Sequence, residues 1–267
     1  SMSIAQQVYR DLEKVRSKAP LVHNITNYVV MNNTANALLA AGASPVMAHA
    51  PEEVKEMAGI ASALVVNIGT LSREWITGMK YAMSEAKEQG IPIVLDPVGV
   101  GATSYRNNTA DELLSDYQPD IVRGNASEIL ALAKKAGETK GVDALHDSSD
   151  ALEAGKKLSE QFDCVVVISG AIDYVIDKNK SFKIENGHPL MSRVTGMGCT
   201  ASALTGAFAA INNNYAEASR HAMVTMGISG ELAAEKSDGP GSMQLQFLDA
   251  LYQLNLEKIK YQLEKSE

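Results

Sequence analysis

Two carboxylates and one arginine end or follow short apolar runs of this sequence. Asp96 ends the run IPIVLD, Arg123 lies in the run DIVRG, and Glu128 comes shortly after it. In an open parallel sheet, ligands bind at the carboxyl ends of the strands, where these side chains would meet. A single polar residue there is more often a turn residue or a helix cap, as Asn125 or Ser127 would be. The whole set, however, is costly to bury unless a charged ligand or a metal compensates it. The other polar residues at the ends of such runs are His23, Asn24, Asn27, Asn67, Thr70 and Ser169.

A glycine turn is the second candidate site. The segment RVTGMGCTASALTGAFAA at 193–210 holds two glycines that open a helix of small residues. Backbone N–H groups at the start of a helix have no partner within the helix and bind anions. GMGCTA also matches the G-x-G-x-x-A dinucleotide fingerprint, but only helices follow it, and the chain contains no Walker A loop. We therefore expect an anion site at Gly196 and Gly198, with close helix packing as the alternative reason for these glycines.

The elements that position these residues alternate between apolar runs and segments of helical periodicity. The runs are near-continuous, which is typical of strands buried on both faces of a mainly parallel sheet covered by helices. Apolar residues spaced three and four apart from Leu71 to Ala86 predict one such helix, which ends at Gly90. YVID and SFKI, joined by the polar turn 178–180, predict a hairpin at the sheet edge. The predicted strands are 21–23, 44–47, 63–68, 91–96, 120–124 and 164–170, and the last helices are predicted at 199–211, 215–236 and 244–263.

Composition excludes several classes of protein. The 267 residues are 45% hydrophobic and 21% charged, which favours one globular α/β domain over 1–267. A net charge of −8 argues against a nucleic-acid partner. The apolar runs fall well short of the roughly 20 residues of a membrane span, so we expect no membrane partner and a cytoplasmic location. Two cysteines and scattered histidines predict neither a disulfide framework nor a zinc site, and Ser1 before Met2 resembles a cleavage scar.

Five motifs together resemble a known family. They are HNITNYVVMNNTANALLAAGASPVMA at 23–48, NIGTL at 67–71, LDPVGVGA at 95–102, RGNASEI at 123–129 and VTGMGC at 194–199. In this order and spacing they resemble the hydroxyethylthiazole kinases, the thiamine-salvage members of the ribokinase-like superfamily. The likeness covers nearly the whole chain, and five separate motifs are far more specific than the glycine turn alone.

The resemblance implies a fold, an activity and an assembly. The implied fold is a central, mostly parallel sheet flanked by helices on both faces, without a separate lid domain. The implied activity is transfer of the γ-phosphate of ATP to the primary hydroxyl of 4-methyl-5-(2-hydroxyethyl)thiazole, and the implied assembly is a homotrimer with active sites between subunits. By matching motifs, the implied site residues are Arg123 and Ser169 for ATP, Met47, Asn27 and Gly196 for the thiazole, and Asp96 and Glu128 for Mg²⁺, held partly through water.

These residue types suit phosphoryl transfer, which needs charge neutralisation and in-line placement more than covalent catalysis. Carboxylate oxygens and water are the ligands that Mg²⁺ prefers. The Arg123 guanidinium can donate to two phosphate oxygens, and the amides of the 196–199 turn can receive the moving phosphoryl group. A methionine such as Met47 packs well against an aromatic ring, although it is equally typical of ordinary core filling.

Cys199 departs from the wider superfamily, in which most members place an aspartate in this turn to draw a proton from the acceptor hydroxyl. The thiazole kinases carry a thiol there. Bound polyphosphate disfavours a thiolate, although the helix N-terminus and Mg²⁺ oppose that effect. Gly196, Gly198 and Cys199 together form the expected catalytic turn. Within it, we expect Cys199 to be a pocket residue near the acceptor hydroxyl rather than a strong base or a nucleophile.

Three other functions remain open from the sequence. A related alcohol kinase would share the phosphate-binding residues and differ at Asn27 and Met47. An ADP-dependent dehydratase of the same fold would release ADP and phosphate without a phosphorylated alcohol, and a non-catalytic nucleotide-binding module would release neither. The polar segment 137–150 is either a mobile loop beside the nucleotide or only a connection.

Overall fold

A single eight-stranded sheet forms the centre of the protein, for which a computed structural model describes residues 1–135 and 147–266. The strand order is β2-β1-β3-β4-β5-β6-β7-β8. The first six strands in this order run parallel, and β7 and β8 form the predicted antiparallel hairpin at one edge. The strands are β1 (Leu21–Ile25), β2 (Ser44–Met47), β3 (Ala63–Asn67), β4 (Ile93–Asp96), β5 (Ile121–Asn125), β6 (Val165–Ser169), β7 (Asp173–Asp177) and β8 (Lys180–Ile184).

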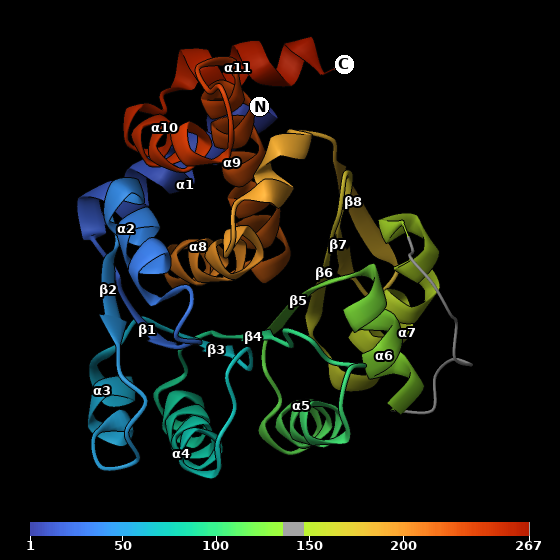
Figure 1. Ribbon diagram of the computed structural model, residues 1–267. Coiled ribbons are helices and arrows are strands. Elements are labelled where there is room, and N and C mark those ends of the chain that lie inside the picture. Colours follow the sequence, from blue (N-terminus) through green and yellow to red (C-terminus); the bar gives the residue numbers. More distant parts are fainter. Residues whose placement is uncertain (136–146, 267) are drawn as a thin grey trace.

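Helices cover both faces of the sheet. Figure 1 shows α8 lying across one face, on the side opposite α4 and α5. The α8 face also carries α1, α2, α9 and α10, whereas α3 to α7 cover the other face. The helices are α1 (Ile4–Lys18), α2 (Met31–Ala41), α3 (Val54–Ile60), α4 (Arg73–Gln89), α5 (Ser104–Tyr117), α6 (Ala126–Lys135), α7 (Leu152–Phe162), α8 (Met197–Ile211), α9 (Tyr215–Glu235), α10 (Pro240–Gln253) and α11 (Leu256–Lys265), with short 3₁₀ turns η1 (Ser148–Ala151) and η2 (Pro189–Arg193).

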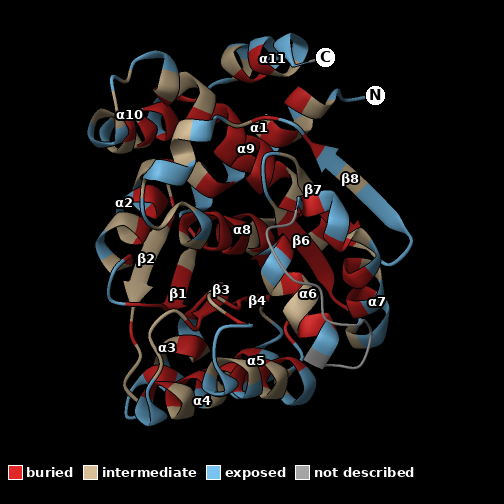
Figure 2. Ribbon diagram, turned by 45° about the vertical axis from the view of Figure 1, so that its right-hand side comes forward, coloured by how far each residue is buried: buried red, intermediate tan, exposed pale blue. Residues whose placement is uncertain are grey.

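Burial on both sides explains the near-continuous apolar runs. Along β3, Leu64 and Val66 belong to the core beneath the α3–α7 helices, whereas Val65 belongs to the core beneath α8. Successive side chains of a strand point to opposite faces, so a strand covered on both sides needs apolar residues at every position. Figure 2 shows buried strands in the middle of the sheet and a largely exposed β8 at its edge. The predicted α/β fold class is confirmed.

Two local predictions are wrong. The helix predicted at 244–263 is two helices, because Leu254 is extended and the Asn255 side chain accepts a hydrogen bond from the Lys258 N–H to start α11. His23 and Asn24, predicted to follow the first strand, lie buried within β1. The His23 ring instead contacts Ala48 O at 2.8 Å through Nε2, so its role is internal packing.

The loop prediction for 137–150 falls mainly on residues 136–146, which lie outside the described residues. Residues 148–150 belong to η1, which the Asp147 N-cap precedes. In the ranges 1–135 and 147–266, no helix is both long and apolar enough to cross a membrane.

Candidate active site

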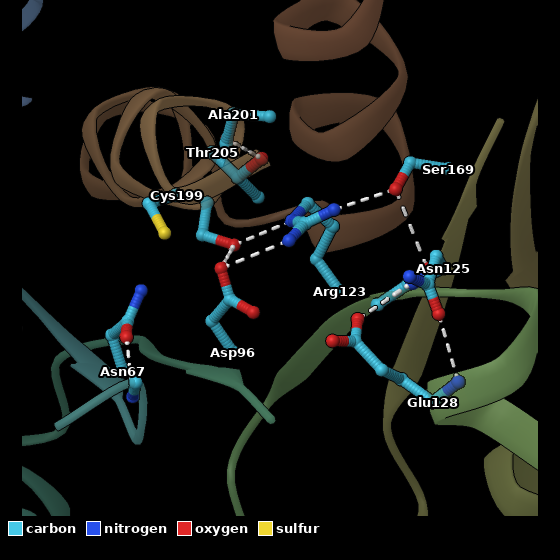
Figure 3. A network of polar contacts seen from close by, with 12 residues as sticks. Asn67, Asp96, Arg123, Asn125, Glu128, Ser169, Cys199, Ala201 and Thr205 are labelled. Atoms are coloured by element: carbon cyan, nitrogen blue, oxygen red, sulfur yellow. Dashed lines mark hydrogen bonds and ion pairs between the residues drawn. The ribbon is translucent and has the colours of Figure 1, made fainter. Parts of the chain in front are cut away.

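Neighbouring strands end in polar residues that the sheet register places together. Asn67 at the end of β3 lies beside Asp96 at the end of β4, and Asn125 of β5 lies beside Ser169 of β6. Parallel strands end on the same edge of a sheet, so residues far apart in the chain converge there. The predicted clustering of these side chains at the carboxyl edge is therefore observed (Figure 3).

A buried ion pair lies at the centre of this edge. Arg123 Nη2 donates to Asp96 Oδ2 at 2.9 Å, and the two residues are only 4% and 0% exposed. The other guanidinium nitrogens donate to two hydroxyls: Nη1 to Ser169 Oγ and Nε to Ser202 Oγ, each at 2.6 Å. Burial disfavours the charge of Arg123, but the carboxylates of Asp96 and Glu128 raise its pKa. The guanidinium thus stays charged and is held by three groups of the protein (Figure 3).

Ser202 is a site residue that the sequence reasoning missed. Its hydroxyl also donates to Asp96 Oδ2 at 2.8 Å, so it joins both members of the ion pair. Ser202 lies four residues after Gly198 on α8, and residues four apart share one face of a helix. That spacing from the glycine turn was the available signal.

Glu128 lies at the start of α6 and faces the same centre. Its Oε1 accepts from the Asn125 N–H and its Oε2 from the Gly99 N–H, both at 2.9 Å, while Asn125 Oδ1 accepts from the Glu128 N–H at 2.8 Å. Asn125 is therefore a helix cap, as considered above, in a reciprocal capping box. Burial and then the negative charge of Asp96 raise the pKa of Glu128. The carboxylate is positioned by backbone N–H groups, and among the described residues the charge of Arg123 acts to lower its pKa.

The glycine turn lies against the ion pair at the start of α8. Gly196 has φ +85°, and a Cβ there would lie 2.7 Å from Val30 Cγ1. The Thr200 N–H donates to Gly196 O at 2.8 Å, so the amides of residues 197–199 precede the helical hydrogen bonds. A Cβ on Gly198 would lie 3.0 Å from Arg123 Nη2. Gly196 therefore leaves no room for a Cβ, whereas a Cβ on Gly198 would press on the guanidinium of Arg123. The amides of this turn are the free donors at the start of α8.

Asn27, Asn67 and Cys199 form the other half of the edge. Asn27 Nδ2 donates to Asn67 Oδ1 at 3.0 Å and lies 3.6 Å from Cys199 Sγ. Asn27 Oδ1 accepts from the Val29 N–H at 3.1 Å, which fixes the orientation of the amide. Burial and then the charge of Asp96 raise the pKa of the Cys199 thiol. A thiol whose pKa lies above its ordinary value is neutral at pH 7.

A cavity of about 510 Å³ opens beside Arg123, and Cys199 is not among the residues that line it. Its inner end is formed by Arg123, Ser169 and Gly198. Its far wall is apolar and comes from η2 and α9, which the sequence reasoning had not connected with the site. A carboxylate, Asp173 of β7, also lines the cavity, and burial raises its pKa to about 6. The methionines of the cavity are Met191, Met197, Met223 and Met226.

Met47 is set apart from these residues. It ends β2, the edge strand opposite the hairpin, where it is half-buried and lies beside Asn24 of β1. Two strands, β1 and β3, separate β2 from Asp96 on β4. The fold therefore places Met47 on the same edge as Asn27 but at the far side of the sheet from Ser169.

Several known proteins with similar sequences carry the same name. The model of the hydroxyethylthiazole kinase family matches residues 12–257. A hydroxyethylthiazole kinase of Syntrophus aciditrophicus (strain SB) is 58% identical over 255 residues, covering 95% of this chain and 94% of that protein. A hydroxyethylthiazole kinase of Leptospira biflexa serovar Patoc is 57% identical over 263 residues, covering 98% of each.

Solved structures agree with the sequence matches. The structure of a hydroxyethylthiazole kinase from Pyrococcus horikoshii OT3 matches with a TM-score of 0.88 and 45% identity, covering 95% of both chains. A pyridoxal kinase from Staphylococcus aureus, solved with AMP-PCP and pyridoxal, matches with a TM-score of 0.62 over 82% of this chain and 91% of that one. At 16% identity, the second match speaks for the fold alone.

Proposed function

This chain belongs to the hydroxyethylthiazole kinase family, and from its site we propose how it phosphorylates 4-methyl-5-(2-hydroxyethyl)thiazole. The reaction consumes ATP, forms a bond between the substrate hydroxyl oxygen and the γ-phosphorus, and releases ADP and a proton. One observation carries the proposal: Arg123, paired with the buried Asp96, lines the inner end of the 510 Å³ cavity together with Gly198 of the turn that opens α8. Cationic and amide donors at the inner end of a cavity are what a transferred phosphoryl group needs.

ATP binds in the cavity, with its phosphates toward Arg123. Ser169 lines the same end and would contact the phosphates through its hydroxyl. Each terminal guanidinium nitrogen carries a second N–H besides the one bonded to protein, so Arg123 keeps donors for phosphate oxygens. The methionine wall suits the purine base, because polarisable thioethers pack well against aromatic rings.

Mg²⁺ fits the carboxylates of this site. Within the described part of the chain, Asp96 Oδ1 is buried and has no hydrogen-bond partner, and Arg123 is one cation facing the two carboxylates Asp96 and Glu128. An unpartnered carboxylate oxygen and a surplus negative charge are both stabilised by a hard cation. Asp96 would hold the ion with Glu128 behind it, partly through water. When bound, Mg²⁺ supplies positive charge beside the phosphates.

The thiazole lies on the other side of the glycine turn. Asn27, fixed by Asn67 and Val29, would line the pocket with Gly196, and Met47 would form its outer wall. In this arrangement the acceptor hydroxyl approaches the γ-phosphate next to Cys199. The amides of residues 197–199 stabilise the transferred phosphoryl group, while Arg123 holds its charge. Cys199, neutral at pH 7, fills space beside the hydroxyl rather than removing its proton.

The assembly is part of the proposal. We expect a homotrimer in which a neighbouring subunit completes the thiazole pocket on the Met47 side, as the family resemblance implies. Size-exclusion chromatography with light scattering tests this, since a monomer with full activity would contradict it. A cytoplasmic location stays a prediction.

Product analysis tests the activity. The protein is incubated with Mg²⁺, ATP and the thiazole alcohol, and the products are examined by mass spectrometry together with released ADP. We expect a phosphorylated thiazole in equal amount to ADP. A panel of other alcohols, including pyridoxal and hydroxymethyl heterocycles, measures specificity. ADP and free phosphate without phosphorylated alcohol would indicate a dehydratase or a hydrolase, and an inert mixture would indicate a binding module.

A further inference from the structure

Arg106, on α5, binds three backbone carbonyls of two loops at the active edge of the sheet. Its Nη1 donates to Ile68 O at 2.9 Å and to Val98 O at 2.8 Å, and its Nη2 donates to Gly69 O at 2.9 Å. Ile68 and Gly69 follow β3, whereas Val98 follows β4. Arg106 therefore joins the loop after β3 to the loop after β4, which α4 and β4 separate in the sequence.

Each of these loops holds one half of the candidate active site. In the β4 loop, the Gly99 N–H donates to Glu128 Oε2 at 2.9 Å. In the β3 loop, the Gly69 N–H donates to Asn67 Oδ1 at 2.9 Å, and the same oxygen accepts from Asn27. Arg106 thus holds the two backbone segments whose N–H groups bind Glu128 and Asn67.

The packing around Arg106 is specific to a guanidinium. Gly99 has φ +76°, and a Cβ there would lie 3.1 Å from Arg106 Nη1, so the loop lies directly on the arginine. The helix start positions the residue, because its N–H donates to Thr103 Oγ1 at 3.1 Å. No ion pair involves Arg106 among the residues that the structure describes. A lysine has one nitrogen and cannot reproduce this fork of donors.

We propose that Arg106 is a positioning residue for phosphoryl transfer, which holds the Gly99 amide against Glu128 and the Asn67–Asn27 pair beside Cys199. This inference rests on the proposed function. Misplacement of reacting groups by about 1 Å can cost roughly a hundredfold in rate, so a residue that only supports backbone can still control catalysis.

The chain offers a matched control. Arg16 of α1 also donates to three carbonyls: Leu251 O and Tyr252 O in the last turn of α10, both at 3.3 Å, and Leu254 O just after that helix, at 2.8 Å. Arg16→Ala removes the same kind of backbone clamp away from the site. A purely structural role of Arg106 predicts the same phenotype for both alanine variants.

The test compares Arg106→Ala, Arg106→Lys and Arg16→Ala by thermal unfolding and steady-state kinetics, at a temperature where each is folded. We expect Arg106→Ala to lose about a hundredfold in kcat/KM, to need more Mg²⁺ for half-maximal rate, and to regain rate with added millimolar guanidinium. Arg106→Lys should show the same defects and gives the measurement if the alanine variant does not fold. Arg16→Ala should lower Tm only. Equal kinetics of all three variants would overturn the inference, whereas an inactive wild-type protein would overturn the proposed function instead.

Discussion

Arg123 Nη2 lies 2.9 Å from Asp96 Oδ2, and both side chains are buried. The pair joins the ends of β4 and β5, and Ser202 ties both of its members to α8. One contact therefore links the centre of the sheet to the helix whose first turn presents the amides of the candidate site. The Arg123 side chain has two tasks, since it neutralises Asp96 and also lines the cavity proposed for ATP.

Arg123→Met should lower both stability and activity. The substitution leaves Asp96 buried and charged without its partner, which costs about 3–5 kcal/mol in the free energy of unfolding. The double variant Arg123→Met with Asp96→Asn removes both charges, so it should recover much of the stability and none of the activity. Urea unfolding and kcat/KM of the two variants check this. Equal stability of the single variant and the wild type would show that Asp96 does not depend on Arg123.

Glu128→Gln should raise the Mg²⁺ concentration that gives half-maximal rate, by about tenfold or more. The reason is that the glutamine amide carries no negative charge to attract the cation. The matched control is Glu217→Gln at the start of α9, where Asn214 Oδ1 accepts from the Glu217 N–H as Asn125 does from Glu128. It should affect only Tm. An unchanged Mg²⁺ titration in Glu128→Gln would remove Glu128 from the metal site.

Gly198→Val should abolish catalysis in a folded protein. Its Cβ would lie 3.0 Å from Arg123 Nη2, which Asp96 already holds, so the side chain forces the guanidinium or the turn away. Gly241 takes the same second position of a helix, in α10, and a Cβ there meets nothing within 4 Å. Gly241→Val should keep normal rates. Thermal unfolding run beside the assay separates the cases: wild-type rates in Gly198→Val would disprove the anion-site role, and loss of fold would assign the glycine to packing.

Cys199→Ala should cost about tenfold or less in kcat, because a loose, metaphosphate-like transition state lets the hydroxyl proton leave late. Removal of a true general base costs roughly 10²–10⁴-fold. The raised pKa of the thiol agrees with a neutral group. Cys199→Asp should remain active. Steady-state kinetics of both variants decide the matter, and a thousandfold loss in folded Cys199→Ala would mean that the thiol takes part in the chemistry.

Asp173 should make the protein less stable as pH rises from about 4 to 6. Burial raises its pKa to about 6 in the folded state, above the unfolded value, so the folded protein binds the extra proton in this interval. The contribution of Asp173 to the free energy of unfolding is complete below pH 4. It falls as the pH rises toward 6, by at most about 3 kcal/mol. Asp173→Asn should remove this loss, because an amide still accepts from the Gly170 N–H without a charge. Urea unfolding of both proteins at pH 4.5 and 7 checks it, and parallel pH profiles would contradict it.

The local features of this protein could be predicted from its sequence. Near-continuous apolar runs indicated strands covered on both faces, polar turns indicated the β7–β8 hairpin, and Asn125 was recognisable as a possible cap of α6. Each of these depends on residues a few positions apart, whose backbone preferences and side-chain periodicity are written directly in the chain. The motifs likewise marked Asp96, Arg123 and Glu128 as a set.

Which side chains meet at the site could not be predicted from the sequence and depends on the three-dimensional arrangement of the elements. Arg123 contacts Ser169 and Ser202, which are 46 and 79 residues away, and Arg106 reaches carbonyls 38 and 37 residues away. Such contacts depend on strand order and on the rotation of α8 and α5 over the sheet, which periodicity does not encode. His23 is a similar case, because its burial in β1 depends on neighbours on both faces of the sheet. So is Asn255, where a capping hydrogen bond starts α11 although the apolar pattern continues across this position. Local propensity therefore specified the elements, and long-range packing specified the site.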